Sequence, residues 1–118
     1  MNNLSPKQKH ALNQANIYQQ QLQILMSQRQ QLELQKKETE LALEELEKEK
    51  ADSVFKAIGP ALVKKSKSDV VADLKISLEK LEARLETFQV QEKKLADKIR
   101  ELSLQTRKNE SEDDEEED

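Results

Sequence analysis

Residues 54–65 read Val-Phe-Lys-Ala-Ile-Gly-Pro-Ala-Leu-Val-Lys-Lys, and this stretch decides the fold of the chain. It contains the one glycine of the sequence and lies near the midpoint. Short apolar runs on both sides of Gly59-Pro60 predict two strands joined by a tight turn. Gly59 suits the positive φ that a type II′ turn requires first, and Pro60 suits the negative φ that follows.

A hairpin of two short strands is only marginally stable in water when it stands alone. The remainder of the chain offers no further strand pattern, because both flanking regions are long, charged and heptad-patterned. The hairpin must therefore find additional strands in other chains. The sequence predicts assembly before any other feature is considered.

The composition argues against a compact globule. Charged residues make up 37% of the 118 residues, and the chain has few aromatic residues, one glycine and two prolines. This profile is typical of long helices or a coiled coil. The absence of cysteine excludes disulfides and thiolate sites. No apolar run reaches transmembrane length and no signal-peptide core opens the chain, so we expect a soluble, cytoplasmic protein.

A first helix is expected from about residue 5 to residue 51. Ser5 and Gln8 can form a capping box, and Pro6 suits the first helical position. Apolar residues then recur at alternating spacings of four and three, which predicts a coiled-coil seam. The seam runs through Ala11, Ala15, Tyr18, Leu22, Leu25, Arg29, Leu32, Lys36, Thr39, Leu43 and Leu46.

A second helix is expected from about residue 68 to residue 108, with several candidate caps in residues 66–69. Its seam runs through Val71, Leu74, Leu78, Leu81, Leu85, Phe88, Glu92, Leu95, Ile99 and Leu102. Residues 109–118 are predicted to be a disordered acidic tail. Within it, residues 110–118 carry eight acids and no base; without them, the net charge changes from −4 to +4.

The two seams can pair as an antiparallel helical hairpin. Leu46 then faces Val71, and Ala15 faces Leu102, so that paired residue numbers add to 117. The heptad alone would also allow sums seven higher or lower, but the turn at Gly59-Pro60 selects 117. In this register Arg29 and Glu92 are neighbours across the seam, and we interpret them as a register-fixing ion pair.

Candidate chemistry is sparse along the chain. His10 is the only histidine, and no second His or Cys accompanies it as a metal ligand. The carboxylates fall on helix exteriors, and no glycine-rich phosphate loop is present. We therefore predict no enzyme activity, cofactor or metal. Scattered bases among glutamines also predict no nucleic-acid site, and no membrane partner is expected.

Several apolar residues lie off the seam, toward the helix ends remote from Gly59. Extra apolar width on a coiled coil either packs against another subunit or binds something transiently exposed. The pattern leaves these two alternatives open. The residues are Leu12, Ile17, Ile24, Met26, Val90 and Leu104.

The order helix, strand, turn, strand and helix, with Tyr18-Gln19-Gln20-Gln21-Leu22 early and residues 54–64 in the middle, resembles prefoldin. The single hairpin is similar to the β-type subunit class. The resemblance covers about residues 5–108, and the hairpin is its most specific part. The acidic tail has no fixed counterpart in the family.

This resemblance implies a mainly α fold, in which one domain spans residues 1–118. It implies a hexamer of two α-type and four β-type subunits, whose hairpins build a β-barrel. The helix tips would hold unfolded polypeptide for delivery to a group II chaperonin, without ATP hydrolysis by the complex. Assembly would rest on Val54, Phe55, Ile58, Gly59, Leu62 and Val63. Client binding would rest on Leu12, Ile17, Tyr18, Leu25, Met26, Leu95, Ile99 and Leu102.

A rival hypothesis is a structural antiparallel coiled coil that tethers or spaces partners. A tether could turn with any short loop, whereas this chain devotes a dozen residues to a strand pattern. A nucleic-acid-associated protein would require salt-dependent binding by a tail-deleted chain. For the tail itself, a role in solubility and a specific role at a chaperonin both stay open.

Overall fold

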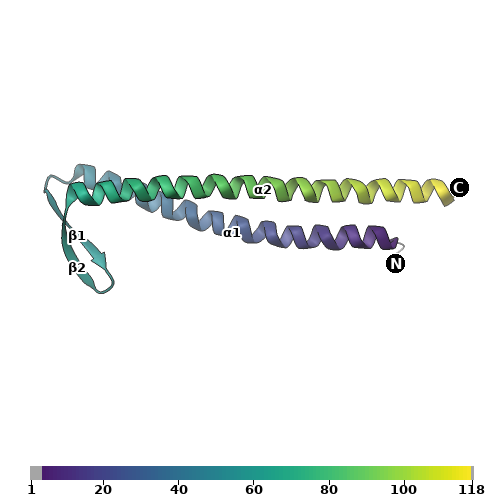
Figure 1. Ribbon diagram of the computed structural model, residues 1–118, viewed down its shortest axis with the longest axis horizontal. Helices are drawn as coiled ribbons and strands as arrows, with labels where there is room; N and C mark the ends of the chain where they lie inside the picture. The colour runs from purple at the N-terminus through teal and green to yellow at the C-terminus, as the bar shows by residue number, and fades with distance from the viewer. Residues whose placement is uncertain (1–3, 118) are drawn as a thin grey trace. The chain divides into compact units, whose positions relative to one another are not determined.

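The computed structural model describes residues 4–117, with side chains as far as residue 107. The elements follow in the order α1 (Pro6–Lys48), β1 (Ser53–Ile58), β2 (Ala61–Ser66) and α2 (Lys67–Glu117), as Figure 1 shows. The chain divides into two compact units. We call residues 29–86 the hairpin unit. We call the residues up to 28 and from 87 onward the terminal unit.

The capping box predicted at the start of α1 is confirmed. The backbone amide of Gln8 donates to Ser5 Oγ at 3.1 Å, and the amide of Ser5 donates to Gln8 Oε1 at 2.8 Å. Two amides that the helix itself cannot satisfy are thus paired. Pro6 is the first helical residue, as expected. The Gln8 side chain is fully buried.

α1 ends at Lys48, slightly earlier than the expected end near residue 51. The last turn tightens, because the amide of Glu49 donates to the carbonyl of Leu46 at 3.3 Å. The amide of Ala51 is taken by the Glu49 carboxylate at 3.1 Å. Lys67 Nζ donates to the carbonyl of Glu49 at 2.6 Å. These bonds satisfy the end of the helix and let the chain leave toward β1.

The central stretch forms the predicted hairpin. β1 and β2 pair antiparallel from Ser53 with Ser66 to Ile58 with Ala61, which leaves Gly59 and Pro60 as a two-residue turn. Gly59 has a φ of +56°, so the expected positive φ is confirmed. A Cβ at Gly59 would meet open space. The requirement for glycine is therefore conformational rather than steric.

α2 follows β2 without a linker. Ser66, the last residue of β2, also caps α2, because its Oγ accepts the amide of Asp69 at 3.4 Å. At the other end, the structure differs from the predicted disorder of residues 109–118, since α2 continues to Glu117. The sequence after Pro60 contains no glycine or proline. A helix that is already formed propagates readily through glutamate-rich sequence. Asp118 lies outside the described residues.

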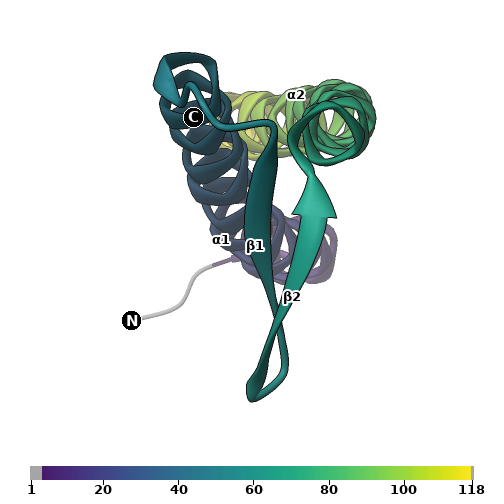
Figure 2. The same cartoon turned by 90° about the vertical axis from the view of Figure 1, so that its left-hand side faces the viewer.

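The predicted seams are confirmed by burial. Every seam residue on both helices is buried or half-buried. Leu32 and Leu85, which the predicted register pairs, are only 6% and 7% exposed. In the hairpin unit Leu46 and Val71 line one hollow, and in the terminal unit Ala15 and Leu102 line another. Both pairs agree with the register sum of 117. Figure 2 shows the hairpin leaving α1 and α2 at their ends.

The polar residues of the α1 seam find partners on their own helix. Arg29 Nη1 lies 2.8 Å from Glu33 Oε1, and Lys36 Nζ lies 3.9 Å from Glu40 Oε1. Thr39 Oγ1 donates to the carbonyl of Gln35 at 2.8 Å. Charged seam positions are therefore tolerated without burying an unpaired charge. The pairing of Arg29 with Glu92 joins residues of different units and stays a prediction.

Candidate functional site

The hairpin carries apolar side chains on both faces. Successive side chains of a strand alternate between faces, and paired residues share one. The pairing of Ala57 with Leu62 therefore puts Leu62 on the same face as Phe55. Ile58 and Val63 share the opposite face with Val54, whose partner is Lys65. In a sheet with one solvated side, the solvated face is polar throughout. Neither face of this hairpin is.

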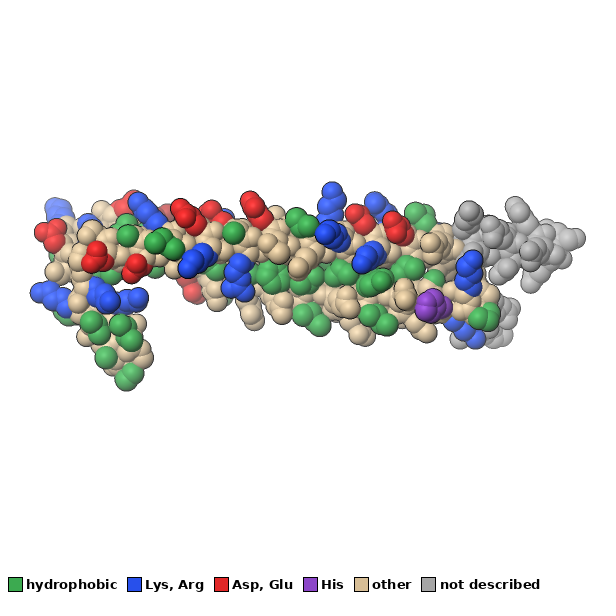
Figure 3. All heavy atoms as spheres, viewed as in Figure 1, with side chains coloured by type: hydrophobic (Ala, Val, Ile, Leu, Met, Phe, Trp, Pro, Cys, Tyr) green, Lys and Arg blue, Asp and Glu red, His purple; other side chains and the backbone are tan. Residues whose placement is uncertain are grey.

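These apolar side chains are uncovered. Phe55 is 68% exposed and Leu62 is 71% exposed, while Ile58 and Val63 are also exposed and Val54 is half-buried. Figure 3 shows apolar side chains over much of the visible surface of the hairpin. Exposed apolar area of this kind on strands with free edges indicates an interaction surface. The hairpin unit contains nothing that would cover it.

Lysines accompany the apolar residues on both faces. Lys64 is opposite Phe55, and Lys56 is opposite Val63. Figure 3 shows lysine and arginine side chains gathered where the hairpin leaves the helices. Lysine can lay its aliphatic stem on apolar surface while the ammonium stays in water. Charge on exposed strands also discourages uncontrolled edge pairing, so these lysines favour a defined partner over aggregation.

The predicted client residues fall into two groups in the terminal unit. Leu12, Ile17 and Met26 are exposed beside the seam of α1. The other five are half-buried seam residues, namely Tyr18, Leu25, Leu95, Ile99 and Leu102. Three side chains thus face solvent directly, and five become available only where the seam opens.

Tyr18 is partly covered by a neighbour from α2. Lys98 Nζ lies 5.3 Å from the centre of the Tyr18 ring, within the range of a cation–π contact. The contact shields one face of the ring. Tyr18 therefore contributes less open surface than the exposed aliphatic residues on the same helix.

One hollow brings two predicted client residues together. Its volume is about 300 Å³, and it is lined by Leu12, Ala15, Leu102, Ser103, Thr106 and Arg107. Thr106 Oγ1 donates to the carbonyl of Leu102 at 2.9 Å, so its methyl group is left for the hollow. Three of the lining residues are aliphatic, and Arg107 adds a guanidinium to the lining. Such a lining accepts an aliphatic side chain better than a polar one.

Further exposed apolar residues extend these surfaces. Ile24, Val90 and Leu104 of the terminal unit are exposed, as their position off the seam suggested, although the predicted client set omits them. Leu34, Leu41 and Ile76 of the hairpin unit are exposed as well, and the sequence reasoning missed them. The missed signal was the seven-residue spacing of Leu34 and Leu41, which places both on the side of α1 away from the seam.

No group of three or more His, Cys, Asp or Glu side chains is placed to hold a metal ion among the residues that the structure describes. Within the same residues, neither helix contains a segment that is both long enough and apolar enough to cross a membrane.

Comparisons with known proteins agree on one family. A family model described as prefoldin subunit matches residues 9–112. Prefoldin subunit beta of Thermococcus kodakarensis is 42% identical over 106 residues, which cover 89% of this chain and 91% of the relative. Prefoldin subunit beta of Archaeoglobus fulgidus is 41% identical over 102 residues, which cover 86% and 88%.

The fold matches a solved structure of the same kind. The crystal structure of the prefoldin beta subunit from Thermococcus strain KS-1 aligns with a TM-score of 0.86 and 40% identity. The alignment covers 92% of this chain and 96% of that one. The resemblance carried by residues 54–64 is thereby confirmed, as is the prediction of two long helices joined by one hairpin. The chain belongs to the prefoldin subunit family.

Proposed function

We propose that this chain is a subunit of an ATP-independent holdase, which binds unfolded polypeptides at the terminal unit and delivers them to a group II chaperonin. Membership of the prefoldin subunit family is consistent with a chaperone subunit. The observation that carries the proposal is the set of exposed aliphatic side chains in the terminal unit. Soluble chains rarely keep several such residues together without a binding role.

The exposed residues suit a client of variable sequence. Leu12, Ile17 and Met26 are aliphatic and exposed, and the Met26 side chain is flexible. Adaptable aliphatic contacts tolerate many apolar partners. Half-buried seam residues such as Leu95 and Ile99 add surface when the helix ends fray, because terminal turns open at low free energy. Each contact is weak, so useful affinity needs several subunits acting together.

In the proposal, the hairpin brings several subunits together, so that several client-binding surfaces act at once. Strands from several chains would pair with β1 and β2 and bury Phe55, Leu62 and Val63 in a β-barrel. We propose a hexamer of four such chains with two α-type subunits. The proposed setting is the cytoplasm, where non-native polypeptide is available as the client.

Suppression of aggregation tests this function. We expect the assembled complex to reduce light scattering from a denatured test protein without ATP. A variant with Leu12→Ser, Ile17→Ser and Met26→Ser should lose most of this suppression, because its aliphatic client contacts are gone. A matched control replaces three exposed apolar residues of the hairpin unit, with Leu34→Ser, Leu41→Ser and Ile76→Ser.

The control should suppress aggregation as well as the unchanged chain. Equal loss in both variants would move the client site away from the terminal unit. If the unchanged complex suppresses nothing, the holdase function itself fails, and a structural tether becomes the better hypothesis. Circular dichroism of all three proteins establishes that the helices are intact.

A further inference from the structure

Among the described side chains of the terminal unit, exposed positive charge is in excess. Its described side chains include seven lysines and arginines, all of which are exposed. They include only three acids, and two of these, Glu92 and Asp97, are half-buried. Asp97 is already engaged, since Arg100 Nη2 lies 3.2 Å from its Oδ1. The surface beside the exposed aliphatic residues is therefore cationic.

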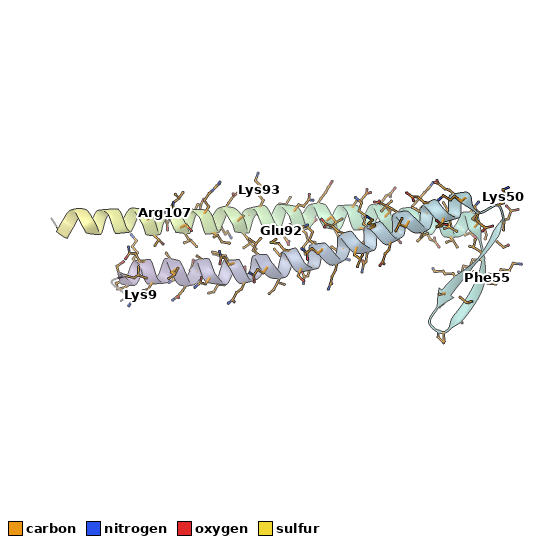
Figure 4. The ribbon with its side chains drawn as sticks, turned by 180° about the vertical axis from the view of Figure 1, so that it is seen from behind. Lys9, Lys50, Phe55, Glu92, Lys93 and Arg107 are labelled. Carbon is orange, nitrogen blue, oxygen red and sulfur yellow. The ribbon has the colours of Figure 1, made fainter. Side chains whose placement is uncertain are left out.

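Three of these seven cations lie on one flank of α2. Lys93, Arg100 and Arg107 are spaced by seven residues, so they lie on the same side of the helix. No ion pair joins Lys93 or Arg107 to an acid among the described side chains. Figure 4 shows Lys93 extending from the outer side of α2, whereas Glu92 lies on the side toward α1.

The same flank meets the aliphatic residues of α1. Leu12 lines the hollow together with Ser103 and Arg107, which ties this side of α1 to the basic side of α2. Met26 repeats the position of Leu12 two heptads later, and Lys9 lies one turn before Leu12. We call this surface the basic groove. It comprises Lys9, Leu12, Met26, Lys93, Arg100 and Arg107.

The basic groove contains no acid of its own. Among the described side chains of the terminal unit, steps of seven residues from its members reach Ser, Asn and Gln at positions 5, 16, 19 and 23, but no Asp or Glu. The opposite flank is different, because it bears Glu101 and because its Lys98 is drawn to the ring of Tyr18. Arg100 is paired with Asp97, but no acid among the described side chains pairs with Lys93 or Arg107. Such cations beside an aliphatic hollow attract a ligand that offers both carboxylates and apolar side chains.

We propose that the basic groove selects, among non-native polypeptides, segments that combine aliphatic and acidic side chains. This proposal rests on the holdase function above and names the client chemistry it prefers. From Lys93 to Arg107, α2 rises about 21 Å, which an extended segment of about six residues would span. The aliphatic side chains of the segment meet Leu12 and Met26, and its carboxylates meet the flanking cations.

The acidic tail of a second copy is a weaker occupant. Residues 110–118 consist of acids and one serine, with no aliphatic side chain to fill the hollow. The tail could meet Lys93 and Arg107, but it would leave Leu12 and Met26 in water. An aliphatic and acidic client uses both halves of the groove, so the observations favour it.

A pair of fluorescent peptides tests the selection on the assembled complex of the full-length chain. Both peptides carry the same leucines and isoleucines, and the remaining positions are Glu in one and Lys in the other. We expect fluorescence anisotropy to show about fivefold tighter binding of the acidic peptide in about 50 mM salt. The difference should largely vanish in about 500 mM salt, because screening removes the charge contribution but leaves the aliphatic one.

Two matched variants locate the effect. Lys93→Gln with Arg107→Gln removes two charges from the basic groove, and Lys7→Gln with Lys94→Gln removes two exposed charges from the opposite flank. We expect only the first pair to abolish the preference for the acidic peptide. An equal reduction of the preference in both double variants would show that net charge, and not the basic groove, selects the acidic peptide. That result would overturn the proposal.

The proposal and the holdase function fail in distinguishable ways. Equal, measurable binding of both peptides to the unchanged chain overturns the selection and leaves the holdase function standing. Absence of binding of either peptide overturns both.

Discussion

Gly59 is the residue on which the hairpin depends most directly. Its φ of +56° lies in the left-handed region, and a Cβ there would meet no atom. The neighbouring Pro60 fixes its own φ near −65° and has no amide to donate, which matches the second place of the turn. A substitution at Gly59 therefore changes backbone strain alone, which makes it an informative probe.

We predict that Gly59→Ala destabilises the hairpin by about 1–2 kcal/mol, because an alanine Cβ disfavours the left-handed region. Gly59→Asn should cost less, since asparagine visits this region more readily. Thermal unfolding of the assembled complex measures both changes. Equal destabilisation by Ala and Asn would contradict the conformational explanation.

At the scale of the element, the hairpin differs from a sheet with one wet side. Phe55 and Leu62 are exposed on one face, and Ile58 and Val63 are exposed on the other. An assembly that only extended the sheet edge would leave both faces in water. The energetic gain from apolar burial therefore requires that partners cover the faces as well as the edges.

We predict that Leu62→Asp and Val63→Asp each break assembly, because each buries an unpaired carboxylate at a cost of several kcal/mol. The two changes test opposite faces of the hairpin. Ile76→Asp is the control, since it places the same charge on an exposed apolar position of α2. Light scattering gives the mass of the complex, and circular dichroism should show retained helix. An intact complex with Val63→Asp would mean that only one face is covered.

The elements were predictable from the sequence to different degrees. The seams could be predicted because each seam position packs against a single partner helix. The heptad pattern alone predicts the burial of Leu32 and Leu85. The exposed Leu34, Leu41 and Ile76 could not, because heptad reasoning attends to the seam and says nothing of the opposite side. The end of α2 was also missed, because composition rules weigh charge but ignore propagation from an existing helix.

The candidate site was predictable in part for a similar reason. Leu12, Ile17 and Met26 were identified as surplus to the seam, and they are exposed. The basic flank was missed, although the seven-residue spacing of Lys93, Arg100 and Arg107 is visible in the sequence, because a heptad seam is traced through apolar positions first. Leu12 and Arg107 line the same hollow although they are nearly a hundred residues apart in the sequence. Their proximity can be seen only once the two helices are paired.

For the whole molecule, the dominant electrostatic feature is the C-terminal segment. Residues 110–118 change the sign of the net charge, which is −4 with them and +4 without them. A chain with net negative charge avoids non-specific attraction to polyanions. The segment also places its acids at the C-terminal end of α2, where the helix dipole disfavours negative charge. Its retention is therefore better explained by solubility than by helix stability.

We predict that deletion of residues 110–118 lowers solubility at neutral pH but leaves affinity for a group II chaperonin unchanged at low and high salt. The physical reason is that the deletion removes colloidal repulsion but none of the exposed apolar contacts. Turbidity against protein concentration and chaperonin binding at two salt concentrations measure the two effects. A salt-sensitive loss of chaperonin affinity would assign the segment a specific role there.

The direct passage from β2 into α2 has a mechanical consequence. Ser66 belongs to the strand and caps the helix, and Lys67 ties the start of α2 to the carbonyl of Glu49 at 2.6 Å. Torque applied to the hairpin thus passes directly into α2, whereas it reaches α1 only through residues 49–52, which lie between the helix and β1. The two helices therefore respond unequally to a movement of the hairpin. If the hairpins of an assembled barrel twisted, the movement would be transmitted chiefly through α2.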